Sequence, residues 1–267
     1  MHAEQAPYSP HPATPSAQSS APSTQHSALT PREQQPRRVL VMMAHPDDPE
    51  FVAGGTIAGW CSEGAWVGYL ICTGGDKGSE DASIPAEELI GMRHAEQRRA
   101  AARLGVQAVD FLDFRDGELE HTLALRGQLV AAIRRHKPDT VVCFDPSSRF
   151  AGDWYIQHPD HYTSGEAVLA AIYPAARNRR TFPELLAQGL EPHTVEQVYL
   201  AATNEPNRWV DIEATLDKKI AAMLEHTSQV SDPEGLSQFL RKLAADAGRG
   251  QGLAAAEAFR FIDASGG

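Results

Sequence analysis

From Arg37 onward, short apolar runs alternate with segments of helical periodicity, and this alternation restricts the fold more than any other feature. The apolar runs are nearly continuous, which is typical of strands that are buried on both faces of a parallel sheet. We expect strands at 38–44, 66–73, 108–114, 140–144 and 197–202, and helices at 49–63, 86–104, 123–136, 164–172, 215–226 and 237–247. A series of strand–helix units of this kind predicts an α/β fold, with a mostly parallel sheet and helices on both faces.

The first 36 residues have a different composition. They are rich in Pro, Ser, Ala, Gln and Thr and contain almost no large aliphatic side chains. Such a segment cannot bury enough apolar surface to offset the entropy of the chain. We therefore predict a disordered tail over residues 1–36, followed by a single α/β domain over residues 37–267.

Charge and composition exclude several classes of protein. The chain has 24 Lys and Arg against 35 Asp and Glu, a net charge of −11, which argues against a nucleic-acid binder or a binder of anionic membranes. No apolar run approaches the ~20 residues of a membrane span. The three cysteines lie far apart in apolar runs, which favours reduced thiols in a cytoplasmic protein over a disulfide framework or a thiolate zinc site.

The string His-Pro-Asp-Asp follows the first expected strand directly. It places His45, Asp47 and Asp48 at the carboxyl end of that strand, where ligands bind in open parallel sheets. Adjacent carboxylates repel each other unless a cation or a proton relieves the repulsion. The string alone could also be a helix N-cap, because Asp is a favoured capping residue. Metal-assisted chemistry is the interpretation that we favour.

A second cluster, His-Pro-Asp-His at 158–161, lies in the long segment after the fourth expected strand. A catalytic zinc site needs three protein ligands and one open position. His45 and Asp48 are three residues apart, so a tight turn lets them converge on one ion, and His161 can complete the set. Two histidines and one aspartate suit zinc or ferrous iron.

The remaining residues of both clusters then have other tasks. Asp47 points away from the ion and is free to act on water. We expect His158 to face a bound substrate, with Asp160 fixing its tautomer or stabilising its protonated form.

These residues resemble a known family. Residues 44–50 followed by Gly-Gly-Thr at 54–56 are similar to the AHPDDxE…GGT signature of the PIG-L/LmbE-type deacetylases, and residues 158–161 are similar to its HPDH motif. Shorter matches are Arg93, Glu96 and Leu-Gly-Val at 104–106 in one helix, and Glu-Ala-Phe at 257–259. The resemblance covers about residues 37–262.

The resemblance implies a Rossmann-like metal hydrolase that removes an acyl group from an amino sugar. It assigns the metal to His45, Asp48 and His161, the role of general base to Asp47, and stabilisation of the oxyanion to His158.

Other residues are candidates for binding the substrate. The turn after the second strand contains Gly74, Gly75, Asp76 and Lys77. Its backbone donors and its one cation could bind sugar hydroxyls or an anionic group. The alternative is an ordinary turn without a role in binding. Arg93 could reach a phosphate or hydroxyl at the rim of the site, or be solvated on an exposed helix face. Some relatives carry a tyrosine two residues before the first histidine of HPDH, where this chain has Ile156, so Tyr155 could serve through a shifted loop.

We therefore expect a metal-dependent N-deacetylase that acts on a small-molecule amino sugar of the N-acetylglucosamine type. Zn²⁺ is the expected cofactor, with Fe²⁺ or another divalent metal as the alternative. The alternative functions are an amidase that acts on a larger sugar conjugate and a sugar- or metal-binding relative without catalysis. The intact base Asp47 argues against the binding protein, and a homo-oligomer is compatible with the sequence.

Overall fold

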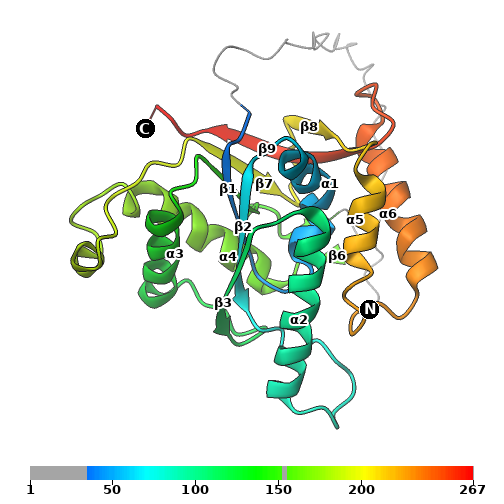
Figure 1. The fold of residues 1–267 in the computed structure, drawn as a ribbon, viewed down its shortest axis with the longest axis horizontal. Helices are drawn as coiled ribbons and strands as arrows, with labels where there is room; N and C mark the ends of the chain where they lie inside the picture. The colour runs from blue at the N-terminus through cyan, green and yellow to red at the C-terminus, as the bar shows by residue number, and fades with distance from the viewer. Residues whose placement is uncertain (1–34, 152–154, 267) are drawn as a thin grey trace, which may run out of the picture. The chain divides into compact units, whose positions relative to one another are not determined.

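The computed structural model describes residues 35–151 and 155–266, and the described residues from Pro36 onward form one compact unit. Its centre is a seven-stranded sheet with the order β3-β2-β1-β4-β7-β9-β8 (Figure 1). The strands are β1 (Arg38–Met43), β2 (Trp66–Thr73), β3 (Ala108–Phe114), β4 (Thr140–Phe144), β7 (Gln197–Ala201), β8 (Arg208–Asp211) and β9 (Ala256–Asp263). Strands β3, β2, β1, β4 and β7 are parallel, whereas β9 pairs antiparallel with both β7 and β8.

Helices cover both faces of this sheet (Figure 1). One face carries α3 (Leu123–His136) and α4 (Pro159–Ala170), and the other carries α1 (Asp48–Ser62), α2 (Ala86–Leu104), α5 (Leu216–Met223) and α6 (Pro233–Gly248). A π-helix, η1 (Ala171–Ala175), and a 3₁₀ helix, η2 (Pro183–Gln188), follow α4. Two short antiparallel strands, β5 (Phe150–Ala151) and β6 (Tyr155–Ile156), precede α4.

Strand β1 shows how the sequence builds two cores. Successive side chains of a strand point to opposite faces. Leu40 and Met42 enter the core beneath α3 and α4, while Val39, Val41 and Met43 enter the core beneath α1 and α2. Because both faces are buried, the run is apolar throughout, which is the pattern that predicted a central parallel strand.

The predicted α/β fold with a mostly parallel, doubly covered sheet is confirmed, and the bounds of β2, β3, β4, α2 and α3 agree with the prediction. Helix α4 begins at Pro159, five residues before the predicted start at Ser164. Proline suits the first turn of a helix, and the His158 side chain accepts a hydrogen bond from the Asp160 amide at the helix start. Strands β8 and β9 were not predicted.

The predicted tail, residues 1–36, lies outside the described residues except for its last two. Among the described residues, no helix is both long enough and apolar enough to cross a membrane.

The Gly-Gly-Thr sequence in α1 has a packing role. A Cβ atom at Gly55 would lie 2.7 Å from Ile212, before α5, and one at Gly54 would lie 3.0 Å from Lys219, within α5, so both glycines allow α1 to approach this part of the chain. The buried carboxylate of Glu257 accepts hydrogen bonds from the Gly55 amide (3.0 Å), the Thr56 amide (2.8 Å) and Lys219 Nζ (2.6 Å). These motif residues therefore join β9, α1 and α5.

We expect Gly55→Ala to lower the free energy of unfolding by about 1–3 kcal/mol, because overpacking a core forces its neighbours to shift. Gly59→Ala in the same helix is the matched control, since a Cβ atom there would meet nothing within 4 Å. Alanine is about 1 kcal/mol better than glycine within a helix, so this control should be neutral or stabilising. Denaturant unfolding measures both, and equal effects would contradict the packing role of Gly55.

Candidate metal centre and catalytic cavity

Residues 44–47 form a tight turn between the end of β1 at Met43 and the start of α1 at Asp48. The backbone amide of His45 donates to Asp48 Oδ2 at 2.6 Å, which closes the turn on itself. Asp47 has a φ of 104°, which a non-glycine residue rarely adopts. The turn thus directs three polar side chains to the carboxyl edge of the sheet.

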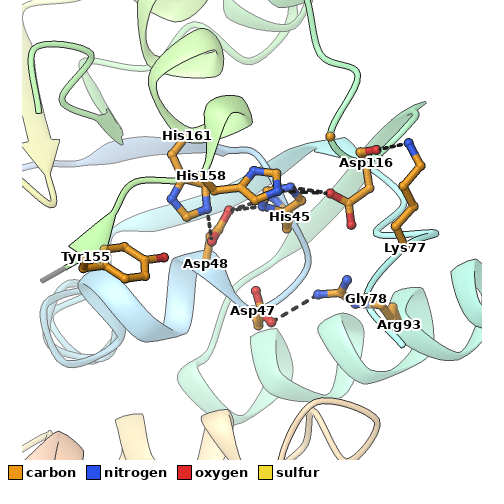
Figure 2. Close-up of a pocket in the computed structure, with 11 residues that line it drawn as sticks. His45, Asp47, Asp48, Lys77, Gly78, Arg93, Asp116, Tyr155, His158 and His161 are labelled. Carbon is orange, nitrogen blue, oxygen red and sulfur yellow. Dashed lines mark hydrogen bonds and ion pairs between the residues drawn. The ribbon is translucent and has the colours of Figure 1, made fainter. Parts of the chain in front are cut away.

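His161, from the first turn of α4, meets the turn at this edge (Figure 2). Asp48 Oδ1 lies 3.2 Å from His161 Nε2, and Asp48 Oδ2 lies 3.4 Å from His45 Nδ1. The two contacts use different oxygens of Asp48, and the groups whose donor atoms all lie within 4.8 Å of one another are His45, His158 and His161, and His45, Asp116, His158 and Asp160. The His161 ring stacks on Phe144 (centroids 4.0 Å apart), and its Nδ1 lies 3.3 Å from Gln157 Oε1. Packing and hydrogen bonding therefore fix its direction.

Negative charge surrounds His45. Burial disfavours its charged form, but hydrogen bonds to Asp116, Asp160 and Asp48 outweigh burial and raise the pKa of His45 to about 12. Burial also opposes ionisation of Asp48, yet the charges and hydrogen bonds of His161 and His45 hold the pKa of Asp48 well below its usual range. Three carboxylates around one imidazole form a centre that a divalent cation would neutralise.

Asp160 has a partner that we did not expect. Its buried carboxylate lies 3.2 Å from His45 Nε2 and accepts hydrogen bonds from the amides of Gly117 (2.7 Å) and Leu119 (3.2 Å). A metal-bound histidine usually donates its other ring N–H to a carboxylate. The Asp160 carboxylate thus contacts His45, while its negative charge also acts to raise the pKa of His158, so its role at His158 stays a prediction.

The tautomer of His158 is nevertheless set by residue 160, through the backbone. The Asp160 amide donates to His158 Nδ1 at 3.2 Å, so the proton of a neutral ring belongs on Nε2. His158 Nε2 lies 3.7 Å from Asp116 Oδ1. Burial and the charge of His45 lower the pKa of His158. The ring therefore presents an N–H donor without needing to be protonated.

Asp47 is held on the other side of the cavity by Arg93 (Figure 2). Arg93 Nη2 donates to Asp47 Oδ2 (3.1 Å) and to the Pro46 carbonyl (2.8 Å), and Nη1 donates to the Gly75 carbonyl (3.1 Å). Burial raises the pKa of Asp47 to about 6, against the lowering by Arg93 and with a further rise from Asp48. A carboxylate with this pKa can accept a proton near neutral pH.

These side chains open into one cavity of about 400 Å³. Its lining comprises His45, Asp47, Asp48, Lys77, Gly78, Arg93, Asp116, Gly117, Tyr155, His158 and His161. The volume is within the range of small-molecule sites. All three predicted ligands, Asp47, His158 and three of the six predicted substrate-binding residues therefore face one space. Asp160 is the one predicted catalytic residue outside the lining.

Gly74, Gly75 and Asp76 were predicted to bind substrate but are outside this lining. A Cβ atom at Gly75 would lie 2.2 Å from Arg93 Nη1, so this glycine makes room for the guanidinium. Asp76 Oδ1 accepts the Asp116 amide at 2.8 Å. These residues support the wall of the cavity.

Arg93 lines the cavity but is only 3% exposed, so it is a buried support of Asp47 and not a solvated rim residue. Lys77 joins two loops at the rim, because its Nζ donates to the Asp116 carbonyl (2.6 Å) and to Glu118 (2.6 Å).

Asp116 was missed by the sequence reasoning. Its carboxylate lies 3.1 Å from His45 Nε2, and it belongs with His45, His158 and Asp160 to a second group of donors near the metal centre. The available signal was its position in an Asp-Gly turn just after β3, at the same sheet edge as the motifs. The three histidines His45, His158 and His161 form another such group, so the ligand set His45, Asp48 and His161 stays a prediction.

A doubly covered α/β sheet with a histidine–aspartate centre at its carboxyl edge defines a class of Rossmann-like enzymes. Comparison with known proteins narrows this class. The family described as PIG-L, GlcNAc-PI de-N-acetylase, matches residues 40–172. The diacetylchitobiose deacetylase of Thermococcus kodakarensis is 34% identical over 228 residues, which cover 85% of this chain and 83% of that protein.

Two further proteins are also similar to this chain. The 1D-myo-inositol 2-acetamido-2-deoxy-alpha-D-glucopyranoside deacetylase of Mycobacteroides abscessus is 28% identical and covers 78% of this chain and 88% of its own length. The structure of N,N'-diacetylchitobiose deacetylase from Pyrococcus horikoshii superposes with a TM-score of 0.79 at 31% identity, over 86% of this chain and 85% of that one. The chain therefore belongs to the PIG-L/LmbE family of N-deacetylases.

Proposed function

We propose that this protein is a metal-dependent hydrolase that removes the acetyl group from an amino sugar of the N-acetylglucosamine type. One observation carries the proposal: the Asp47 carboxylate opens into the same cavity as the donor set His45, Asp48 and His161. A general base beside three metal donors is the arrangement that hydrolysis of an amide by activated water requires.

The residues divide the reaction between them. A divalent cation held by His45, Asp48 and His161, with zinc as the first candidate, would acidify a water and polarise the amide carbonyl. Asp47 accepts a proton from the attacking water and returns it to the amine nitrogen as the C–N bond breaks. His158 Nε2–H donates to the carbonyl oxygen as that oxygen gains negative charge. The products are acetate and the free amino sugar.

The relatives supply the substrate class. Two of the proteins that resemble this chain at 31–34% identity act on diacetylchitobiose, and a more distant one acts on an acetamido-glucopyranoside of inositol. The shared unit is an N-acetylated glucosamine, so we propose that the acetamido group of that unit binds at the metal donors. A panel of glycosides would identify the second half of the substrate.

We expect the purified protein to release acetate from N,N'-diacetylchitobiose or a related glycoside, and to lose this activity after a chelator removes the metal. Adding back Zn²⁺, Fe²⁺ or Co²⁺ should restore it and rank the metals. Mass spectrometry of a glycoside panel measures the loss of one acetyl group. Binding of the sugars without chelator-sensitive release from any of them would favour a non-catalytic binding protein instead.

A further inference from the structure

Three buried polar side chains form a hydrogen-bonded chain behind Asp47. Gln97 of α2 accepts the Asp47 amide through Oε1 at 2.8 Å, and its Nε2 lies 3.0 and 2.9 Å from the two carboxylate oxygens of Glu50 in α1. His226, after α5, places Nε2 3.3 Å from Glu50 Oε2. Gln97, Glu50 and His226 are each 0% exposed and are outside the lining of the cavity, so they act on the site through other residues.

The donors and acceptors in this series of hydrogen bonds can be assigned in only one way. A carboxylate only accepts hydrogen bonds, so the NH₂ end of the Gln97 amide must face Glu50. The carbonyl oxygen of Gln97 is thereby turned toward the Asp47 N–H. His226 Nε2 also contacts Oε2 of this Glu50 carboxylate and helps to hold it in place. Side chains of α1, α2 and the segment after α5 are thus linked, through Gln97, to a single backbone amide.

That amide belongs to the one residue of the turn with an unusual backbone. The φ of Asp47 is 104°, and such conformations are strained for a non-glycine residue and persist only where neighbours enforce them. Arg93 holds the carboxylate end of Asp47 and the preceding carbonyl, while Gln97 holds its N–H. Together they fix the direction in which the Asp47 carboxylate points.

We propose that Gln97, oriented by Glu50 and His226, is a positioning residue that holds the backbone of Asp47 in the conformation that aims the base at the attacking water. This inference rests on the proposed deacetylase activity. It gives a role to His226 and to Glu50, the glutamate directly after the His-Pro-Asp-Asp-Pro string.

The neighbouring residue of α2 provides a matched control. The buried carboxylate of Glu96 accepts hydrogen bonds from Thr227 Oγ1 (2.8 Å), the Ser228 amide (2.8 Å) and Ser228 Oγ (2.6 Å). It ties the same segment after α5 to the same helix, but its partners do not include the turn at 44–47. Glu96→Gln therefore tests the loss of a buried hydrogen bond that does not reach this turn.

The experiment compares Gln97→Glu with the double variant Glu50→Gln/Gln97→Glu. The single change sets two carboxylates against each other. In the double variant, the new amide at position 50 donates to the new carboxylate at position 97, whose other oxygen accepts the Asp47 N–H, while the amide carbonyl at position 50 accepts from His226. Shape and total charge are restored, the hydrogen bond between positions 50 and 97 runs in the opposite direction, and the acceptor for the Asp47 N–H is kept.

We expect Gln97→Glu to lower kcat about tenfold or more at unchanged metal content and nearly unchanged KM, because a small misplacement of a catalytic group costs up to about 10²-fold. The double variant should recover most of the loss, and Glu96→Gln should lower the unfolding midpoint while kcat stays near that of the wild type. If Gln97→Glu does not fold, Gln97→Met, which removes the acceptor without adding charge, is measured under the same criteria.

An unchanged kcat in the single variant, or a metal-loaded double variant that stays as slow as the single one, would overturn the positioning role. A kcat loss of the same size in Glu96→Gln would also overturn it. If the wild-type protein releases no acetate from any glycoside, the proposed function fails, and this outcome is distinct from a failure of the positioning role.

Discussion

Asp47→Asn is expected to lower kcat by about 10²–10⁴-fold, the range that general acid–base groups contribute, while metal content stays at the wild-type level. The asparagine side chain has the same shape, and its amide oxygen can still accept from Arg93 Nη2, which lies 3.1 Å from Asp47 Oδ2. What it lacks is a basic oxygen that can take the proton of the attacking water. Steady-state acetate release and metal analysis of the same preparation check both parts.

Asp145→Asn is the control for this substitution. Asp145 also follows a central strand at the carboxyl edge and is 3% exposed, but it bonds to Ser147 and Thr203 and is outside the cavity lining. The kcat of Asp145→Asn should remain near that of the wild type even if the variant unfolds at a lower denaturant concentration. A wild-type kcat in Asp47→Asn would remove Asp47 from the mechanism, and a loss of metal would make it a ligand.

Local sequence was a good guide wherever neighbouring residues decide the structure. The turn at 44–47 was predictable because an apolar strand, Pro49 and the start of α1 leave few conformations for the residues between them. The location of His161 beside this turn was predictable for a similar reason, since the carboxyl ends of β1 and β4 are neighbours in a parallel sheet. Periodicity likewise gave the bounds of α2 and α3, whose buried faces are long and regular.

The pattern failed where contacts come from distant segments. Gly75 was assigned to substrate because a glycine-rich turn offers backbone donors, but Arg93, 18 residues later, fills the space beside it. Asp160 was assigned only to its sequence neighbour His158, but folding also brings His45 to its carboxylate. Asp116 carries no motif of its own. Its role depends on the register of β3 beside β2, which composition does not determine.

The same distinction separates ligands from supporting residues and leads to the second large expected effect. His161→Ala should lower metal affinity by more than about 100-fold, because loss of a partner outside the ligand set already costs about 10–100-fold. The substitution leaves two donors of the predicted set, His45 and Asp48, where a catalytic zinc site needs three protein ligands. Acetate release should fall with metal content and recover in part at high metal concentration.

His158→Ala is the matched comparison, because the two histidines lie on the same helix turn with ring centroids 5.5 Å apart. His158 is outside the predicted ligand set, and its Nδ1 accepts the Asp160 amide, so we expect its removal to lower kcat while the ion stays bound. Metal analysis after dialysis against a weak chelator separates the two variants. Full occupancy in His161→Ala together with metal loss in His158→Ala would exchange their roles, because the three imidazoles of His45, His158 and His161 also lie close enough to share an ion.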